Sequence, residues 1–366
     1  MNAAPPLSAI EGPDAAPAGA APRQPLLVTM GDAVGIGPEC IVRAFARDAL
    51  DDAIAIADLA VLRRAAAVAG LDLPLARIDK PADVREVPAG CLAVVQPQGL
   101  PEGLAALPWG AVDARAGAAA ARCIEAAVAL VLRGEAAAMV TAPVHKAALA
   151  AAGVPFPGHT EMLQALCAGA EGPPPVRMML ANDELRVVLV TIHQSLRTAI
   201  EALSFDAVLQ TVRIAARAAL QWGLEQPRIA VAGLNPHAGE GGLFGDEEIR
   251  IIGPAIEAAR REGIDARGPF PPDTVFMRAR DAAGHPGEFD LVVAMTHDQG
   301  LIPVKYLGVH DGVNVTLGLP LVRTSPDHGT AFDIAGRGLA DPRSLEAAAR
   351  QARRAVLSRV RTQGPG

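Results

Sequence analysis

The sequence predicts an α/β protein built around a mostly parallel sheet. Short apolar runs typical of buried strands alternate along the chain with amphipathic stretches typical of helices. Strands that alternate with helices favour parallel pairing, because each helix returns the chain to the same end of the sheet. The 366 residues, of which 51% are hydrophobic and 20% are charged, suffice for two packed domains or one large α/β unit.

The predicted elements begin after residue 24. The first strand is expected in the run PLLVTM at 25–30, and a glycine-rich turn follows it. Pro38 lies near the start of the next helix, where the missing N–H of proline costs little. Further strands are expected at 136–144, 185–193, 228–234 and 289–297, and further helices at 118–134, 206–223, 246–263 and 343–360. Acidic residues in the first turn of the 246–263 helix support its start.

The composition argues against several other classes of protein. The net charge of −7 disfavours broad binding to nucleic acid or to an anionic membrane, which requires basic patches. The cysteines (Cys40, Cys91, Cys123 and Cys167) are scattered, so neither a zinc ribbon nor a disulfide scaffold is expected, and a cytoplasmic location fits best. No apolar run is long enough to span a membrane. Residues 1–24, rich in Ala and Pro, are expected to form a disordered leader without signal-peptide features.

Three histidines stand at the ends of predicted strands. His193, His237 and His297 come directly at or after three of the apolar runs. Ligands of open α/β sheets bind beyond the carboxyl ends of the strands, so these side chains are expected at the functional edge. Three imidazoles that leave an open position suit a catalytic divalent metal. Taken singly, each histidine is better explained as a hydrogen-bonded loop residue, whereas the three together leave both interpretations open.

Two further loops carry candidate site residues. His159 and Thr160 in FPGHTEML could bind a substrate, or Thr160 could cap a helix that has Glu161 in its first turn. His145 and Lys146 follow the strand at 136–144. Lys146 could hold a charge or carry a proton, or it could begin a solvated helix.

The C-terminal part carries a potential anion site and a glycine-rich loop. Lys305, Asn314 and Arg323 are nine residues apart, and Lys and Arg suit an anion to which Asn adds a hydrogen bond. The stretch 325–342 is rich in Gly and small polar residues, which let the backbone approach a ligand closely. The early Gly35-Ile36-Gly37 lacks the last glycine of GxGxxG, so a tight turn is favoured over a Rossmann fingerprint. No GxxxxGK[ST] or GxSxG motif is present.

Six motifs together resemble the PdxA family of 4-hydroxythreonine-4-phosphate dehydrogenases in order and spacing. They are TMGDAVGIGPE, TAPVHKAAL, GHTEM, GLNPHAGEGGLFGDEE, AMTHDQGLIPVKYLG and GVNVTLGLPLVRTSPDHGTAFDIAG. The resemblance extends from about Leu26 to the final helix. It implies a fold like that of isocitrate and isopropylmalate dehydrogenases: two α/β domains with a cleft between them, in a homodimer. Domain 1 on the cofactor side would comprise residues 25–138 and 303–366, and domain 2, with the metal ligands and the dimer interface, residues 139–302.

The resemblance also implies roles for individual residues. A divalent metal (Zn, Co, Mn or Mg, with Mg less expected from ligand softness) would be bound by His193, His237 and His297, with ligands drawn from both subunits. The substrate would contact His159, Thr160, Lys305, Asn314 and Arg323. NAD or NADP would lie against His328, Gly329, Thr330 and Asp333. Lys146 and Asp298 are candidates for the general base.

The implied reaction oxidises the C3 hydroxyl of 4-phosphohydroxy-L-threonine. The oxidised product then loses carbon dioxide and gives 3-amino-2-oxopropyl phosphate for pyridoxal 5'-phosphate synthesis. The sequence departs from the usual family pattern at GDAVGIG, at Gln194-Ser195 and at Thr296. Related substrates are therefore alternatives: 4-phosphoerythronate, phosphothreonate or the cis-dihydrodiol of terephthalate. The retained Lys305, Asn314 and Arg323 favour a phosphorylated one, and a binding protein without NAD reduction is the alternative outside the enzymes.

Overall fold

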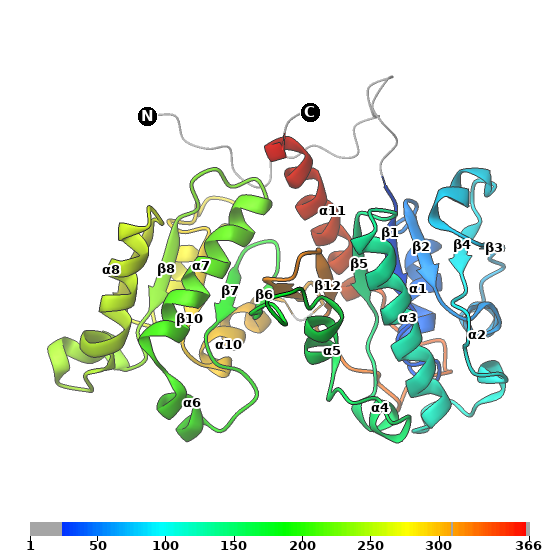
Figure 1. Ribbon diagram of the computed structural model, residues 1–366, viewed down its shortest axis with the longest axis horizontal. Helices are drawn as coiled ribbons and strands as arrows, with labels where there is room; N and C mark the ends of the chain where they lie inside the picture. Colours follow the sequence, from blue (N-terminus) through cyan, green and yellow to red (C-terminus); the bar gives the residue numbers. More distant parts are fainter. Residues whose placement is uncertain (1–23, 309, 364–366) are drawn as a thin grey trace. The chain divides into compact units, whose positions relative to one another are not determined.

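The computed structural model describes residues 24–308 and 310–363 (Figure 1). The predicted leader at 1–24 therefore lies, except for its last residue, outside the described residues. The described chain forms two compact units. The larger unit comprises Gln24–Val176 and the chain from His310 onward, and the smaller unit comprises Arg177–Val309. Within the described part, no helix is long and apolar enough to cross a membrane.

The larger unit contains seven of the described strands, in the order β3-β4-β2-β1-β5-β12-β11. They are β1 (Leu26–Thr29), β2 (Ala53–Ile56), β3 (Leu75–Ile78), β4 (Leu92–Val95), β5 (Ala138–Thr141), β11 (Val313–Leu317) and β12 (Arg323–Pro326). All neighbours pair in parallel except β11 and β12, which are antiparallel. The helices of this unit are α1 (Gly37–Phe45), α2 (Leu59–Val68), α3 (Ala114–Leu132), α4 (Lys146–Ala151), α5 (His159–Leu166) and α11 (Arg343–Gln363), with short 3-10 turns at η2 (Pro81–Glu86) and η3 (Leu104–Ala106).

The smaller unit contains five of the described strands, in the order β6-β7-β10-β8-β9. They are β6 (Arg177–Ala181), β7 (Arg186–Leu189), β8 (Ile229–Ala232), β9 (Ala266–Phe270) and β10 (Leu291–Ala294). Only β6 runs antiparallel to its neighbour here, so the prediction of a mostly parallel α/β fold is confirmed. The helical segments are α6 (Leu196–Ala202), α7 (Phe205–Gln221), η4 (Pro236–Gly242), the π turn η5 (Glu248–Ile252), α8 (Gly253–Arg261), α9 (Val275–Ala279) and α10 (His297–Leu307).

The units divide the chain at different positions from those expected from the resemblance. The divisions fall at 176/177 and 309/310 rather than at 138/139 and 302/303. The first difference arises because β5 pairs in parallel with both β1 and β12, which belong to the larger unit. The second arises because α10 is one continuous helix that packs on β7 and β10, so residues 303–307 stay with the smaller unit.

Gly300 allows α10 to lie close to the sheet of the smaller unit. An added Cβ would lie 2.4 Å from Leu189 Cδ2 and 2.8 Å from Val187 Cγ1, and both side chains are fully buried. We expect Gly300→Ala to lower the free energy of unfolding by about 1–3 kcal/mol through overpacking. Denaturant unfolding would compare the free energy of unfolding of this variant with that of Gly169→Ala. The added Cβ of Gly169→Ala would meet no atom within 4 Å. Equal stabilities of the two variants would contradict close packing at Gly300.

Candidate active site

The three strand-end histidines follow three neighbouring strands of the smaller unit. His193 comes after β7, His237 after β8 and His297 after β10. β10 lies between β7 and β8 and pairs in parallel with both (Figure 1). The carboxyl ends of these strands therefore meet at one edge of the sheet, where ligands of α/β proteins bind.

Hydrogen bonds tie these strand ends to one another. The Thr191 hydroxyl, two residues before His193, donates to the Met295 carbonyl at 2.7 Å. The Gln299 side chain accepts from Met295 N at 2.7 Å and donates to the Gly233 carbonyl, at the end of β8, at 2.8 Å. The three histidine-bearing segments are therefore linked in a continuous chain of bonds. Sequence reasoning missed Gln299, since its role depends on which strands are neighbours.

The rings of His193 and His297 lie close together. Their centroids are 5.4 Å apart and their planes are inclined by 46°. Two imidazoles that bind one tetrahedral ion at about 2.0–2.1 Å have centroids about 5 Å apart, so this spacing fits two ligands of one metal. His237 is not grouped with them: among the described residues, no three His, Cys, Asp or Glu side chains are arranged to hold a metal ion. The structure thus brings two of the three predicted ligands together.

Two of the three predicted ligands have an uncommon backbone conformation. The φ angles of His193 and His237 are 42° and 52°. Six non-glycine residues of the described chain have positive φ, and four of them lie in the loops of these two histidines. Such a conformation costs a non-glycine residue about 1–2 kcal/mol, so surrounding contacts must hold it. Strain of this kind clusters at functional sites.

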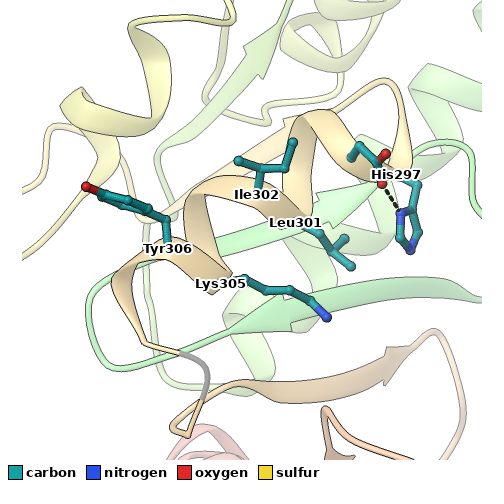
Figure 2. A pocket seen from close by; sticks show the side chains of 6 residues that line it. His297, Leu301, Ile302, Lys305 and Tyr306 are labelled. Atoms are coloured by element: carbon teal, nitrogen blue, oxygen red, sulfur yellow. Dashed lines mark hydrogen bonds and ion pairs between the residues drawn. The ribbon is translucent and has the colours of Figure 1, made fainter.

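A pocket of about 430 Å³ lies along α10. It is lined by His297, Asp298, Leu301, Ile302, Lys305 and Tyr306. His297, Leu301 and Lys305 recur every four residues, so they share one face of the helix, as Figure 2 shows. His297 Nδ1 lies 2.7 Å from Asp298 Oδ1 (Figure 2). The predicted substrate residue Lys305 thus shares a pocket with a predicted metal ligand and a candidate base.

In the larger unit, Arg323 is a buried cation that has no acidic partner among the described residues. Its Nη2 and Nε donate to the Thr141 hydroxyl at 2.6 and 3.1 Å, and its Nη1 donates to the Thr316 hydroxyl at 3.0 Å. Within the described part of the chain, no carboxylate forms a salt bridge with it. Burial lowers the pKa of Arg323 to about 10, so the guanidinium is charged at neutral pH. A buried charge of this kind is suited to an anionic ligand.

Two more predicted substrate residues accompany Arg323. His159 begins α5, and its buried Nε2 forms no hydrogen bond within the described chain. Burial, and to a lesser degree the charge of Arg323, lower the pKa of His159 well below its ordinary value, so its imidazole is neutral. Asn314 lies two residues before Thr316 on β11, so both side chains point to the face on which Arg323 binds Thr316.

The neighbouring loop carries Lys146 and Thr160, for which the sequence left alternatives open. Lys146 is the first residue of α4 and is exposed, as expected for a solvated helix start. A Cβ built at Gly158 would lie 3.8 Å from Lys146 Cε, so this side chain passes near the N-cap of α5. Gly158 is the N-cap of α5 and forms no side-chain cap, so the interpretation of Thr160 as the capping residue is wrong.

The predicted cofactor loop packs on the early glycine turn. The Thr330 carbonyl accepts from Ile36 N at 3.0 Å, and Thr330 itself is buried. A Cβ at Gly35 would lie 3.1 Å from the Thr330 Cβ, so the absence of a side chain allows this contact. The glycine-rich turn at 31–37 (GDAVGIG) therefore packs against the loop that carries Thr330 and supports it.

The other predicted cofactor-binding residues belong to the same loop. His328 Nδ1 lies 2.9 Å from the Gly329 carbonyl, while its buried Nε2 forms no hydrogen bond within the described chain. Asp333 is exposed. Glu39, which is buried in α1, accepts from Gly336 N at 2.6 Å and anchors the end of the loop.

Asp32 is a buried acid that sequence reasoning also missed. It follows β1 in the Gly-Asp step, and its Oδ1 accepts from Val34 N at 3.0 Å. Its Oδ2 forms no hydrogen bond within the described chain. Burial raises the pKa of this carboxyl group, partly offset by the Val34 hydrogen bond. An acidic residue directly after a strand was the available signal.

Comparison with known protein families matches residues 49–352 to the family described as pyridoxal phosphate biosynthetic protein PdxA. The chain belongs to the PdxA family. The resemblance inferred from the motifs is therefore confirmed.

Similar PdxA proteins cover nearly the whole chain. The 4-hydroxythreonine-4-phosphate dehydrogenase of Beijerinckia indica is 56% identical over 326 residues, which are 88% of this chain and 93% of that protein. The D-threonate 4-phosphate dehydrogenase of Salmonella typhimurium is 47% identical over 87% of this chain and 94% of that protein. The crystal structure of 4-hydroxythreonine-4-phosphate dehydrogenase from Klebsiella pneumoniae has a TM-score of 0.82 at 44% identity, and the match covers 91% of this chain and 98% of that one. The chain is thus an oxidoreductase with the α/β fold of the PdxA family.

Proposed function

We propose that this oxidoreductase acts in the cytoplasm on 4-phosphohydroxy-L-threonine, with NAD or NADP as the hydride acceptor. The oxidised product then loses carbon dioxide to give 3-amino-2-oxopropyl phosphate for pyridoxal 5'-phosphate synthesis. The observation that carries the proposal is Arg323, a buried guanidinium bonded only to hydroxyl groups among the described residues, which suits a phosphate group. The 56% identical relative from Beijerinckia indica, named for this substrate, supports it.

Each predicted binding residue has a definite task in this proposal. Arg323 and Asn314 bind the anionic part of the substrate, and Lys305 offers a further cation beside His297. Neutral His159 donates or accepts a hydrogen bond without adding charge. Thr160, the second residue of α5, adds a hydroxyl next to His159. NAD or NADP lies against the loop of His328, Gly329, Thr330 and Asp333.

A divalent metal ion belongs to the proposed site. His193, His237 and His297 would hold it at a homodimer interface, with ligands drawn from both subunits; the spacing of the His193 and His297 rings supports this. Histidine nitrogen favours Zn, Co or Mn over Mg. Such an ion would supply Lewis acidity, which would make a bound hydroxyl more acidic and would stabilise negative charge during loss of carbon dioxide. Donation from His297 Nδ1 to Asp298 would leave the Nε2 lone pair available.

A base must accept the proton of the C3 hydroxyl as hydride leaves for the nicotinamide. Asp298 and Lys146 are the two candidates. Asp298 is 83% exposed and lies beside His297, and Lys146 lies beside the N-cap of α5. A carboxylate can take a proton directly, whereas the lysine must first be in its neutral form.

D-Threonate 4-phosphate is a second candidate substrate. It has the same phosphorylated carbon skeleton, with a hydroxyl group in place of the amino group. The specific observation in its favour is a relative named for it that is 47% identical to this chain, close to the 49% of one relative named for 4-hydroxythreonine-4-phosphate. The anion-binding role of Arg323 suits both substrates equally.

A substrate panel decides between these proposals. NADH and NADPH formation would be measured with both phosphorylated substrates, 4-phosphoerythronate and the cis-dihydrodiol of terephthalate. We expect the highest kcat/KM with 4-phosphohydroxy-L-threonine, by about tenfold or more, which corresponds to about 1.4 kcal/mol of transition-state binding. A higher value with D-threonate 4-phosphate would favour the second candidate. The absence of nicotinamide reduction with every substrate would support a binding protein instead.

A further inference from the structure

The loop that carries His237, residues 233–245, is built around one buried carboxylate. Glu248 is 4% exposed and begins the π turn η5. Its Oε1 accepts from Leu234 N at 2.7 Å and from Asn235 N at 2.8 Å. Its Oε2 accepts from Asn235 Nδ2 at 2.9 Å. The carboxylate thus holds the two residues with which the chain leaves β8 towards His237.

The next residues form a left-handed turn. The φ angles of 237–241 are 52°, 53°, 81°, 43° and 67°, and three of these residues are not glycine. Left-handed backbone is unfavourable for each of the three non-glycine residues, so the turn is strained. A turn with this cost persists only where contacts outside it hold it.

The glycines of the loop allow it to close on the same carboxylate. A Cβ at Gly239 would lie 2.8 Å from Glu248 Oε2, and a Cβ at Gly233 would lie 2.9 Å from Oε1. A Cβ at Gly245 would lie 2.4 Å from Asn235 Nδ2. The loop backbone therefore wraps directly around the Glu248 carboxylate and its Asn235 partner.

We infer that Glu248 is the positioning residue for His237: its carboxylate fixes the left-handed loop and so presents the imidazole to a divalent metal ion. The inference rests on the metal site of the proposed function. Without the carboxylate the loop would relax towards ordinary backbone conformations, because no other acceptor in the described chain binds the amides of Leu234 and Asn235. The conformational entropy lost in ordering His237 would then reduce the free energy of metal binding, whereas in the wild type the loop is already ordered before the metal binds.

The inference predicts a loss of metal affinity that exceeds any loss of stability. The full-length protein would be freed of metal, and Co²⁺ would be titrated into it by calorimetry. We expect Glu248→Ala to weaken Co²⁺ binding by about 10- to 100-fold, as for other residues that orient a ligand histidine. Glu248→Gln should lose less Co²⁺ affinity, because the glutamine carbonyl oxygen can still accept from both backbone amides. Only the bond to Asn235 Nδ2 would be lost, since the glutamine NH₂ group would face it. The visible spectrum of the cobalt-loaded protein would report altered ligand geometry.

Asp290 offers a matched control in the same unit. It also accepts from a backbone amide, Arg228 N at 2.7 Å, and from the guanidinium of Arg228, but it lies just before β10, at the opposite end of the strand. Asp290→Asn should lower the unfolding temperature and leave Co²⁺ affinity within about twofold, a difference of less than 0.5 kcal/mol. Asn235→Ala removes the bonds from Nδ2 to Glu248 Oε2 and to Glu247 Oε2 but leaves the Leu234 and Asn235 amides bound to Glu248. Its Co²⁺ affinity should lie between those of Glu248→Ala and the control, and it tests the inference if Glu248→Ala does not fold.

Two results would overturn the inference in distinguishable ways. Unchanged Co²⁺ affinity in Glu248→Ala, Glu248→Gln and Asn235→Ala, with lost affinity in His237→Ala, would overturn the role of Glu248 alone. Unchanged affinity in His237→Ala would overturn the proposed metal site, and the inference with it.

Discussion

Replacing Arg323 by methionine is expected to lower kcat/KM for a phosphorylated substrate at least about 30-fold while leaving the protein as stable as before, or more stable. Loss of one partner of a buried charge pair costs about 2–5 kcal/mol of binding free energy. Methionine fills a similar volume without charge. Since no acidic partner balances Arg323 among the described residues, its removal should change the free energy of unfolding by about 0 to +4 kcal/mol in favour of the folded state.

Steady-state kinetics and denaturant unfolding together would check this expectation. The kcat/KM for the phosphorylated substrate should fall by roughly 30-fold to several thousand-fold. Arg323→Lys should recover only part of it, because an ammonium cannot make the forked bonds to Thr141 and Thr316. Arg177→Met is the matched control, since Arg177 also donates to a hydroxyl and an amide oxygen, at 2.6 and 2.8 Å. A large loss of stability in Arg323→Met, with kcat/KM retained, would show that Arg323 is structural.

Removal of a divalent metal, or His297→Ala, is expected to lower kcat by about a thousandfold or more. Lewis acidity contributes several kcal/mol to transition-state stabilisation, and each 1.36 kcal/mol is a factor of ten in rate. The metal content of the purified protein and activity before and after chelation would be measured for wild type, His193→Ala and His297→Ala. Zn, Co or Mn should restore the wild-type enzyme better than Mg.

His285→Ala is the control for these variants. His285 lies in the same unit, and its ring Nδ1 is 3.1 Å from the Arg280 carbonyl, away from the strand ends. It should retain both metal and activity. Full activity of chelated wild-type protein, or of His297→Ala after chelation, would exclude a role for metal in the reaction.

The sequence predicted the parts of the fold that depend on local patterns. Apolar runs marked β1, β5, β7, β8 and β10, and their alternation with helices indicated parallel pairing. The order of the strands could not be predicted, because β10 lies between β7 and β8 although it follows both in the chain. The observed domain limits differ from the expected ones for the same reason. β12 pairs with β5 and so places it in the larger unit, but β12 lies far from β5 in the sequence. The 246–263 helix begins as a π turn, which a 3.6-residue periodicity cannot reveal.

The sequence could predict which residues form the candidate site, but not which residues hold them in place. Histidine, lysine and arginine residues that directly follow apolar runs can be recognised in the sequence, because they stand where loops at strand ends are expected. Glu248 and Gln299 look in the sequence like ordinary residues of a helix, and only the folded backbone shows which amides they bind. Asp32 was passed over because burial, which decides its behaviour, is a tertiary property.

The larger unit is assembled from two separate stretches of chain, and this affects how the protein is made. Arg323 begins β12, and its hydrogen-bond partner Thr141, at the end of β5, precedes it by 182 residues. At about 5–20 residues per second, the ribosome needs roughly 10–40 s to synthesise that interval. Until then β5 is an uncovered sheet edge on a nascent chain, which is a template for pairing with other chains. Translation therefore delivers the missing strand and the buried Arg323 charge together, and β5 stays an open edge until Arg323 emerges.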